Sequence, residues 1–122
     1  MISRVKFVSI PTADQDRALE FWTRKVGFKL VQDVPMGPGQ RWIELEVPGA
    51  ETHVVLFTPT GQEDRVGSFV PMAWATQDVE KTYEELRGRG VEFQQPPKKE
   101  SWGTSAVFKD ADGNQFVLSS ES

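Results

Sequence analysis

The stretch FKDADGNQFVL, residues 108–118, has the pattern of a hairpin. Asp112 and Gly113 fit a tight turn, because glycine adopts the positive φ that such a turn requires. Gln115, Val117 and Ser119 alternate with residues 116 and 118, which predicts a strand over 115–119 with two distinct faces. The predicted function depends on which side chains lie on the sheet face that carries Val117.

The order of elements that leads to this hairpin occurs twice along the chain. In the first half, hydrophobic periodicity predicts a helix that begins with a capping box of Thr12 and Gln15 and stops at Gly27. The second half repeats it, with a helix over 76–87 that Gly90 closes. The predicted strands lie over 5–10, 28–34, 40–47 and 53–58, and then over 70–75, 91–94, 104–109 and 115–119.

Gly27 and Gly90 lie 63 positions apart, as do Asp14 and Gln77 at the two helix starts. The sequence therefore predicts a single α+β domain over residues 1–122. It consists of two βαβββ units, 1–58 and 69–122, joined by a linker over 59–68. The prediction is an open curved mixed sheet with the helices on its convex face.

Composition excludes several classes of function. The chain has 122 residues, no cysteine and a net charge of −4, so disulfides, thiol catalysis and thiolate metal sites are excluded. No basic stripe is present to neutralise phosphates, and we expect no nucleic-acid partner. The N-terminal sequence has no signal-peptide pattern and no apolar run is long enough for a membrane span, so we expect a cytoplasmic protein.

Alternation also predicts which side chains share the sheet face away from the helices. Ile43 and Leu45 should meet the helix, so Trp42 and Glu44 should face the other way with Phe7. Leu56, Phe108 and Val117 are predicted on this second face, and His53 on the helix side. The second face mixes aromatic, small and acidic groups, as a binding pocket does.

The paired βαβββ units, the segment DQDRALEFWTRKVGFKL (14–30) and the closing FKDADGNQFVL together resemble the vicinal oxygen chelate superfamily. That superfamily includes glyoxalase I, extradiol dioxygenases and bleomycin-resistance proteins, and its enzymes hold a divalent metal with His and Glu ligands. The resemblance places those ligands at Phe7, Leu56, Pro71 and Val117. None of these side chains can bind a metal, and we expect neither a metal nor another cofactor. Glu44 and Glu46 could hold a hard cation weakly, and a bulge could turn His53 toward them.

The resemblance leaves three functions open. The first is a metal-independent protein, similar to the bleomycin-resistance branch, that binds a small molecule in a concave cavity of a homodimer, side by side or by exchange of units. A cationic aromatic compound would suit acidic groups beside aromatic walls. The predicted ligand-binding residues are Phe7, Trp42, Glu44, Leu56, Trp102, Phe108 and Val117. The second is a metal-free lyase or isomerase with Glu44 as general base, its pKa raised by an apolar wall. The third is a protein-interaction module.

Overall fold

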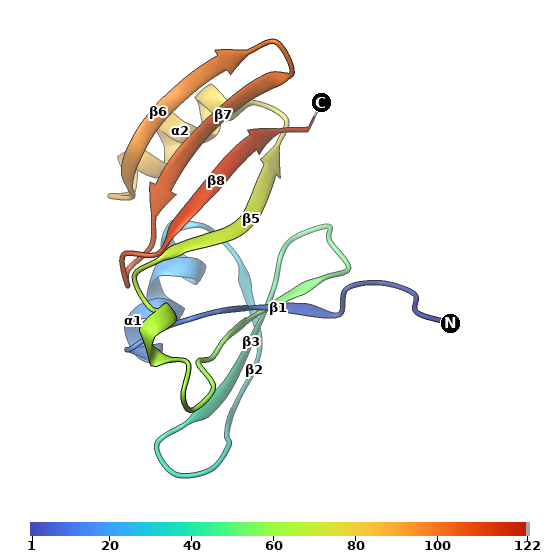
Figure 1. Cartoon of the computed structure of the whole chain (residues 1–122), viewed down its shortest axis with the longest axis vertical. Helices are drawn as coiled ribbons and strands as arrows, with labels where there is room; N and C mark the ends of the chain where they lie inside the picture. The colour runs from blue at the N-terminus through green and yellow to red at the C-terminus, as the bar shows by residue number, and fades with distance from the viewer. Residues whose placement is uncertain (122) are drawn as a thin grey trace. The chain divides into compact units, whose positions relative to one another are not determined.

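The structure is a computed structural model that describes residues 1–121, and it divides into two compact units, Met1–Val66 and the part from Gly67 onward (Figure 1). Each unit contains one four-stranded sheet and one α-helix. The strand order is β1-β4-β3-β2 in the first sheet and β5-β8-β7-β6 in the second. Position by position this is the same order, which confirms the predicted α+β fold of two βαβββ units.

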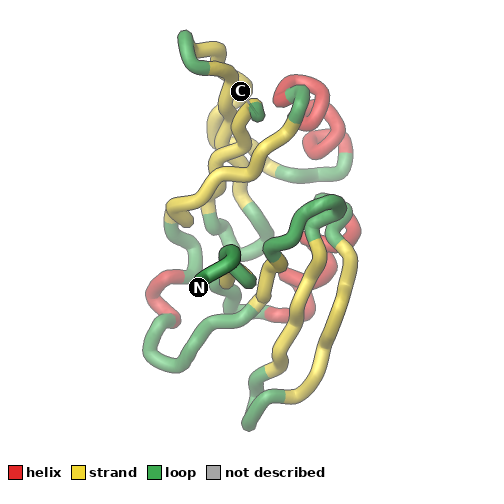
Figure 2. Tube along the Cα trace, turned by 90° about the vertical axis from the view of Figure 1, so that its right-hand side faces the viewer, coloured by secondary structure: helices red, strands yellow, loops and turns green. Residues whose placement is uncertain are grey.

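The elements of the first unit are β1 (Phe7–Ile10), α1 (Gln15–Glu20), a π-helical turn (Phe21–Lys25), β2 (Lys29–Pro35), β3 (Arg41–Glu46), β4 (His53–Leu56) and a 3-10 turn (Glu63–Arg65). β1 runs parallel to β4, whereas β4, β3 and β2 are antiparallel neighbours. Figure 2 shows β2 and β3 as an extended hairpin. The elements of the second unit are β5 (Phe69–Thr76), α2 (Val79–Gly88), β6 (Glu92–Glu100), β7 (Gly103–Lys109) and β8 (Gln115–Ser120).

Both helices begin at an aspartate, so the capping box of Thr12 and Gln15 predicted for the first helix is wrong. The Asp14 side chain accepts from the Arg17 amide at 3.1 Å, and Asp78 accepts from the Lys81 amide at 3.1 Å. In each unit a threonine two residues earlier accepts from the aspartate amide, at 3.1 Å for Thr12 and 3.4 Å for Thr76. Asp78 is thus the residue of the second unit that corresponds to Asp14, and the predicted correspondence of Asp14 with Gln77 is wrong by one residue.

The core of the first unit lies between its sheet and the α1 segment, which consists of α1 and the π-helical turn that follows it. Ile43, Leu45 and Trp22 are fully buried. The register pairs Leu45 with Val54 and Ile10 with Leu56, so this face of the sheet also carries Val54 and Leu56. The prediction that Leu56 lies on the second face is therefore wrong, and so is the prediction of His53 on the helix side. Residues 54–56 are all apolar, so alternation could not set the phase of this strand.

The phase of one strand in the second unit also differs from the prediction. β7 pairs with β8 so that Val107 lies beside Val117 and Phe108 beside Phe116. Phe108 and Phe116 are buried, with ring centroids 5.6 Å apart. Phe108 is consequently a core residue on the face opposite Val117, and it does not line a ligand wall.

The hairpin between β7 and β8 forms as predicted, with Gly113 at a φ of 80°. Asn114 is fully buried in its turn. Its side-chain oxygen accepts from the Gly67 amide at 2.7 Å, and its side-chain nitrogen donates to Asp110 at 2.9 Å. Asn114 therefore fastens the hairpin to the start of the second unit.

One edge of the second sheet carries residues that oppose the addition of another strand. β6, at one edge of the second sheet, contains Pro96 and Pro97 followed by Lys98 and Lys99. Proline offers no backbone N–H and lysine resists burial, so both discourage the addition of another strand.

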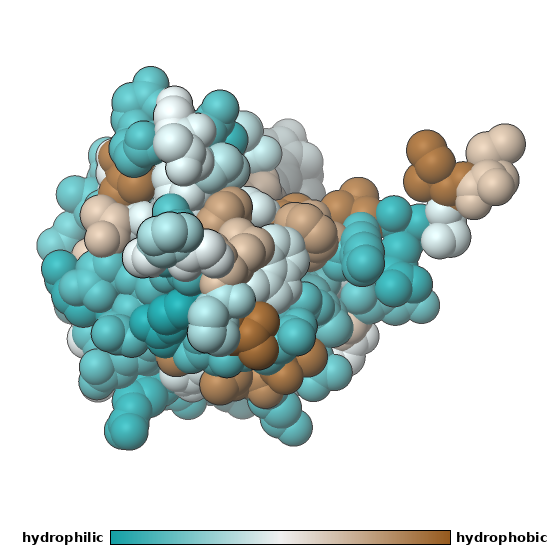
Figure 3. Space-filling view, turned by 90° about the horizontal axis from the view of Figure 1, so that it is seen from below, coloured by the Kyte–Doolittle hydropathy of each residue, from teal (hydrophilic) through white to brown (hydrophobic). Residues whose placement is uncertain are grey.

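The face of the molecule in Figure 3 is mainly hydrophilic, with hydrophobic residues gathered in small patches. No helix in the described part of the chain is long and apolar enough to cross a membrane.

Candidate functional site

The candidate site is the open face of the first sheet, which is the face opposite the α1 segment. Register and side-chain contacts place on it Phe7, Trp42, Glu44, His53, Val55 and Phe57. Trp42 and Glu44 alternate with the buried Ile43 and Leu45 along β3. The predicted register of this strand, on which the site depends, is thus correct.

Glu44 lies at the centre of a hydrogen-bonded group of three side chains. Trp42 Nε1 donates to Glu44 Oε1 at 3.0 Å, and His53 Nδ1 lies 2.5 Å from Glu44 Oε2. The Glu44 side chain is 20% exposed and that of His53 is 28% exposed, so water reaches both. Each carboxylate oxygen therefore already has one protein partner.

These contacts lower the pKa of Glu44. The hydrogen bond from His53 is the largest cause and that from Trp42 the second, and together they outweigh the opposing effect of burial. The predicted rise of this pKa, on which the role of Glu44 as a general base depends, is therefore wrong. A carboxylate stabilised in its charged form is a weaker base and a better fixed negative charge.

Two aromatic rings lie next to Trp42. The ring of Phe7, from β1, meets Trp42 edge to face at a centroid distance of 5.3 Å. The ring of Phe57, just after β4, is tilted against that of Trp42 at a centroid distance of 6.1 Å. Phe7 remains 37% exposed, and Trp42 is half-buried. The face thus offers partly exposed ring area beside a fixed carboxylate.

Sequence reasoning missed His53 and Phe57 as members of this group. The signal that could have found them is His53 itself. Histidine is polar and the three residues that follow it in β4 are apolar, so a strand with one core face places His53 outward when Val54 and Leu56 face the core. Neither residue needed a bulge to reach the face, since β4 pairs with β3 without irregularity.

The other predicted ligand-binding residues do not join this group. Leu56 and Phe108 are core residues, as described above. Val117 lies beside Ala73 on the second sheet, on the face away from Phe116 and Leu118. Trp102 lies in the turn between β6 and β7 and is 58% exposed.

The residues present do not fit a catalytic divalent metal. Phe7, Pro71 and Val117 carry no donor atom. Val55 in β4 and Phe57 just after it lie on the same face as Phe7, and both are apolar. Within residues 1–121 no group of three or more His, Asp or Glu side chains is arranged to hold a metal ion. His53 and Glu44 supply two donors, whereas zinc sites use three or four protein ligands.

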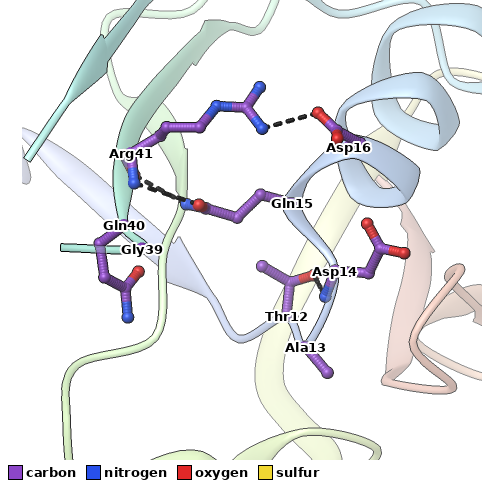
Figure 4. Close-up of a pocket in the computed structure, with 8 residues that line it drawn as sticks. All are labelled: Thr12, Ala13, Asp14, Gln15, Asp16, Gly39, Gln40 and Arg41. Atoms are coloured by element: carbon purple, nitrogen blue, oxygen red, sulfur yellow. Dashed lines mark hydrogen bonds and ion pairs between the residues drawn. The ribbon is translucent and has the colours of Figure 1, made fainter.

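A polar pocket of about 330 Å³ lies elsewhere in the first unit, between the start of α1 and the start of β3 (Figure 4). Gln15 spans it, donating to the Arg41 carbonyl at 2.7 Å and accepting from the Arg41 amide at 3.1 Å. The Arg41 guanidinium binds Asp16 at 2.6 Å and Asp33 at 2.8 Å. These groups bind one another and hold α1 to the β2–β3 hairpin, so we locate the candidate site on the open face.

The two βαβββ units and the open sheet face are features of the Glyoxalase/Bleomycin resistance protein/Dioxygenase superfamily, whose sequence model matches residues 4–118. The chain belongs to this superfamily. It is 40% identical over 121 residues to the uncharacterized protein YetH of Bacillus subtilis, a match that covers 97% of this chain and 98% of YetH.

Two solved structures show the same fold at substantial identity. A superfamily member from Sphaerobacter thermophilus is 35% identical with a TM-score of 0.88, and 98% of each chain is covered. TnmS3, an antibiotic binding protein from Streptomyces sp. CB03234, is 37% identical with a TM-score of 0.85, covering 99% of this chain and 98% of TnmS3.

Proposed function

We propose that this protein binds a planar aromatic small molecule on the open face of the first sheet, without a metal and without changing it chemically. The observation that carries the proposal is the group of Trp42, Phe7 and Glu44. Ring area that is partly exposed can stack on a planar ligand, and the charged carboxylate beside it attracts a cation. The similarity to an antibiotic binding protein, TnmS3, supports binding as the function.

The charge of Glu44 favours a cationic ring over an anionic one. Its lowered pKa keeps the carboxylate charged at neutral pH. Each of its oxygens retains a second lone-pair site, since a carboxylate accepts about four hydrogen bonds and two are in use. A ligand cation can therefore be added without displacing Trp42 or His53.

The test is a fluorescence titration with three rings of different charge: the cation proflavine, neutral coumarin and the anion naphthalene-2-sulfonate. Proflavine should bind most tightly and naphthalene-2-sulfonate most weakly. Trp42→Ala should weaken proflavine binding by about tenfold through lost stacking area, which corresponds to roughly 1.4 kcal/mol. Trp102→Ala is the matched comparison at an exposed tryptophan. Equal affinity of wild type and Trp42→Ala for every ring would contradict the proposal.

A second candidate function is metal-free proton transfer in a lyase or isomerase reaction, which the contact between His53 and Glu44 favours. A carboxylate hydrogen-bonded to an imidazole fixes its tautomer and orientation. With Nδ1 engaged by Glu44, the other imidazole nitrogen of His53 is the proton acceptor in this candidate. A glyoxalase assay in the presence of a chelator, with wild type and His53→Gln, separates turnover from binding alone.

We also propose that two copies of the chain form a homodimer. Hydrophobic residues are exposed at the start of the chain and along β2, including Val5 at 60%, Val31 at 50% and Leu30 at 49%. An apolar surface of this kind favours contact with another protein surface.

A further inference from the structure

Glu44 joins two strands through its side chain. One of its oxygens accepts from the indole of Trp42, which lies on the same strand two residues earlier. The other oxygen contacts the imidazole of His53, which lies on the neighbouring strand β4. His53 and Trp42 therefore interact through Glu44.

The Trp42 ring has few other restraints at its polar end. Phe7 meets it at the edge and Phe57 at a tilt, both through apolar contacts that leave the ring half-buried. Apolar ring contacts act on the ring as a whole, so without a hydrogen bond at Nε1 the indole keeps some rotational freedom. A fixed acceptor removes that freedom before a ligand arrives, and such preorganisation raises affinity.

The acceptor is fixed in turn by His53. A glutamate side chain has three rotatable bonds, and a single contact from Trp42 would leave the two side chains free to move together. The second contact, from β4, ties the carboxylate to a strand that is hydrogen-bonded on both of its sides. The position of Trp42 is then set by two strands.

We infer that His53 is a positioning residue for ligand binding: by holding Glu44, it fixes the Trp42 ring in the orientation that receives a planar ligand. The inference rests on the proposed function for its effect on affinity. It predicts that loss of His53 weakens the binding of neutral rings as well as cationic ones. A direct charge effect would instead change cation binding alone.

The first test uses the unliganded protein. A nitrogen-15 correlation spectrum shows the indole N–H signals of the four tryptophans, and Trp42→Phe identifies that of Trp42 by its loss. His53→Leu should move and broaden the Trp42 signal, because Glu44 loses the contact that holds it in place. His53→Gln, whose amide can donate to Glu44, should largely restore it. Glu46→Gln, on the same face of β3, is the control and should leave the signal in place.

The second test repeats the titration with coumarin and proflavine. His53→Leu should weaken coumarin binding about three- to tenfold, and His53→Gln should recover most of the loss. Circular dichroism checks that each variant is folded, and His53→Ala replaces the leucine variant if that one does not fold.

An unchanged Trp42 signal in folded His53→Leu would overturn the inference. A moved signal with unchanged coumarin affinity would overturn its link to binding. If the wild type binds none of the rings, the proposed function fails, and the indole signal alone still decides whether His53 positions Trp42.

Discussion

The imidazole Nδ1 of His53 lies 2.5 Å from Oε2 of Glu44, a contact that joins β3 to β4 on the open face of the first sheet. It supplies the largest cause of the lowered pKa of Glu44. The carboxylate is thus a fixed charge on this face.

The first prediction concerns that charge. Glu44→Gln should weaken proflavine binding by roughly 1–3 kcal/mol, because a partly desolvated charge pair is lost while the amide oxygen can still accept from Trp42. Coumarin binding should change less. For wild type, Glu44 should stay charged as the pH falls to its ordinary pKa of 4.5 and below, and its attraction for a cation should be lost only there. Equal losses for both rings would argue against a charge effect.

The second prediction is that no catalytic divalent metal binds. Phe7, Pro71 and Val117 have no donor atoms, and the pair of His53 and Glu44 is too small a ligand set for tight binding. Isothermal titration calorimetry with Ni²⁺, Zn²⁺ and Mn²⁺ should show no tight site. One strong site per chain would refute this, and loss of that site in His53→Gln would locate it.

The third prediction concerns Asp110, a buried carboxyl in the turn between β7 and β8. Burial raises its pKa to about 6 from an ordinary value of 3.8, against the hydrogen bonds from Asn114 and Asp112. Between these two values the folded state holds a proton that the unfolded state has lost. This group therefore lowers the free energy of unfolding as the pH rises from about 4 to about 6, by on the order of 2–3 kcal/mol.

Carbon-13 NMR of the aspartate carboxyls should show one of them titrating near pH 6, and Asp110→Asn should remove that signal. Urea denaturation of wild type across this pH range should show the corresponding fall in stability. A titration of Asp110 below pH 4 would contradict the expected effect of burial.

The fourth prediction concerns Asn114. Replacement by alanine leaves the Gly67 amide and one Asp110 oxygen without the partners they have in wild type, which should cost about 2–3 kcal/mol in the free energy of unfolding. Asn114→Asp keeps the acceptor for Gly67 but sets a second carboxylate beside Asp110. The free energy of unfolding of that variant should be low at neutral pH, where both carboxylates are charged, and should rise in acid. Denaturation midpoints at pH 5 and 8 measure both effects.

The fifth prediction is a homodimer in solution. Sedimentation velocity at micromolar concentration should show a species of twice the 13.7 kDa chain mass. Leu30→Lys and Val31→Lys place charges on the exposed apolar stretch of β2, and should weaken association if that stretch lies in the contact. A species of single-chain mass at every concentration would exclude the dimer.

Most of the fold could be predicted because two kinds of signal were strong. The repeat of helix stops at Gly27 and Gly90, both with φ near 90° in the structure, defined the two units. The alternation of residues 42–45 has one polar and one apolar set, so it gave the register of β3 correctly. Each of these signals is local and contains an explicit contrast between neighbouring residues.

The errors arose where that contrast is missing. Residues 54–56 are uniformly apolar, and residues 104–108 mix small and apolar side chains, so either phase buried a plausible set. Pairing with neighbouring strands decides the phase, and pairing is not a local property. For this reason Leu56 and Phe108 were placed on the wrong face, and His53 and Phe57 were missed.

The two prolines and two lysines in β6 have a consequence for what happens when many copies of this chain are concentrated together. A fibril grows when an exposed edge strand accepts an identical strand from the next molecule, and each addition exposes a new edge. At β6, Pro96 and Pro97 have no amide hydrogens, so the free edge lacks a donor there, and Lys98 and Lys99 would place like charges face to face. Growth by strand addition at β6 is therefore opposed at its first step.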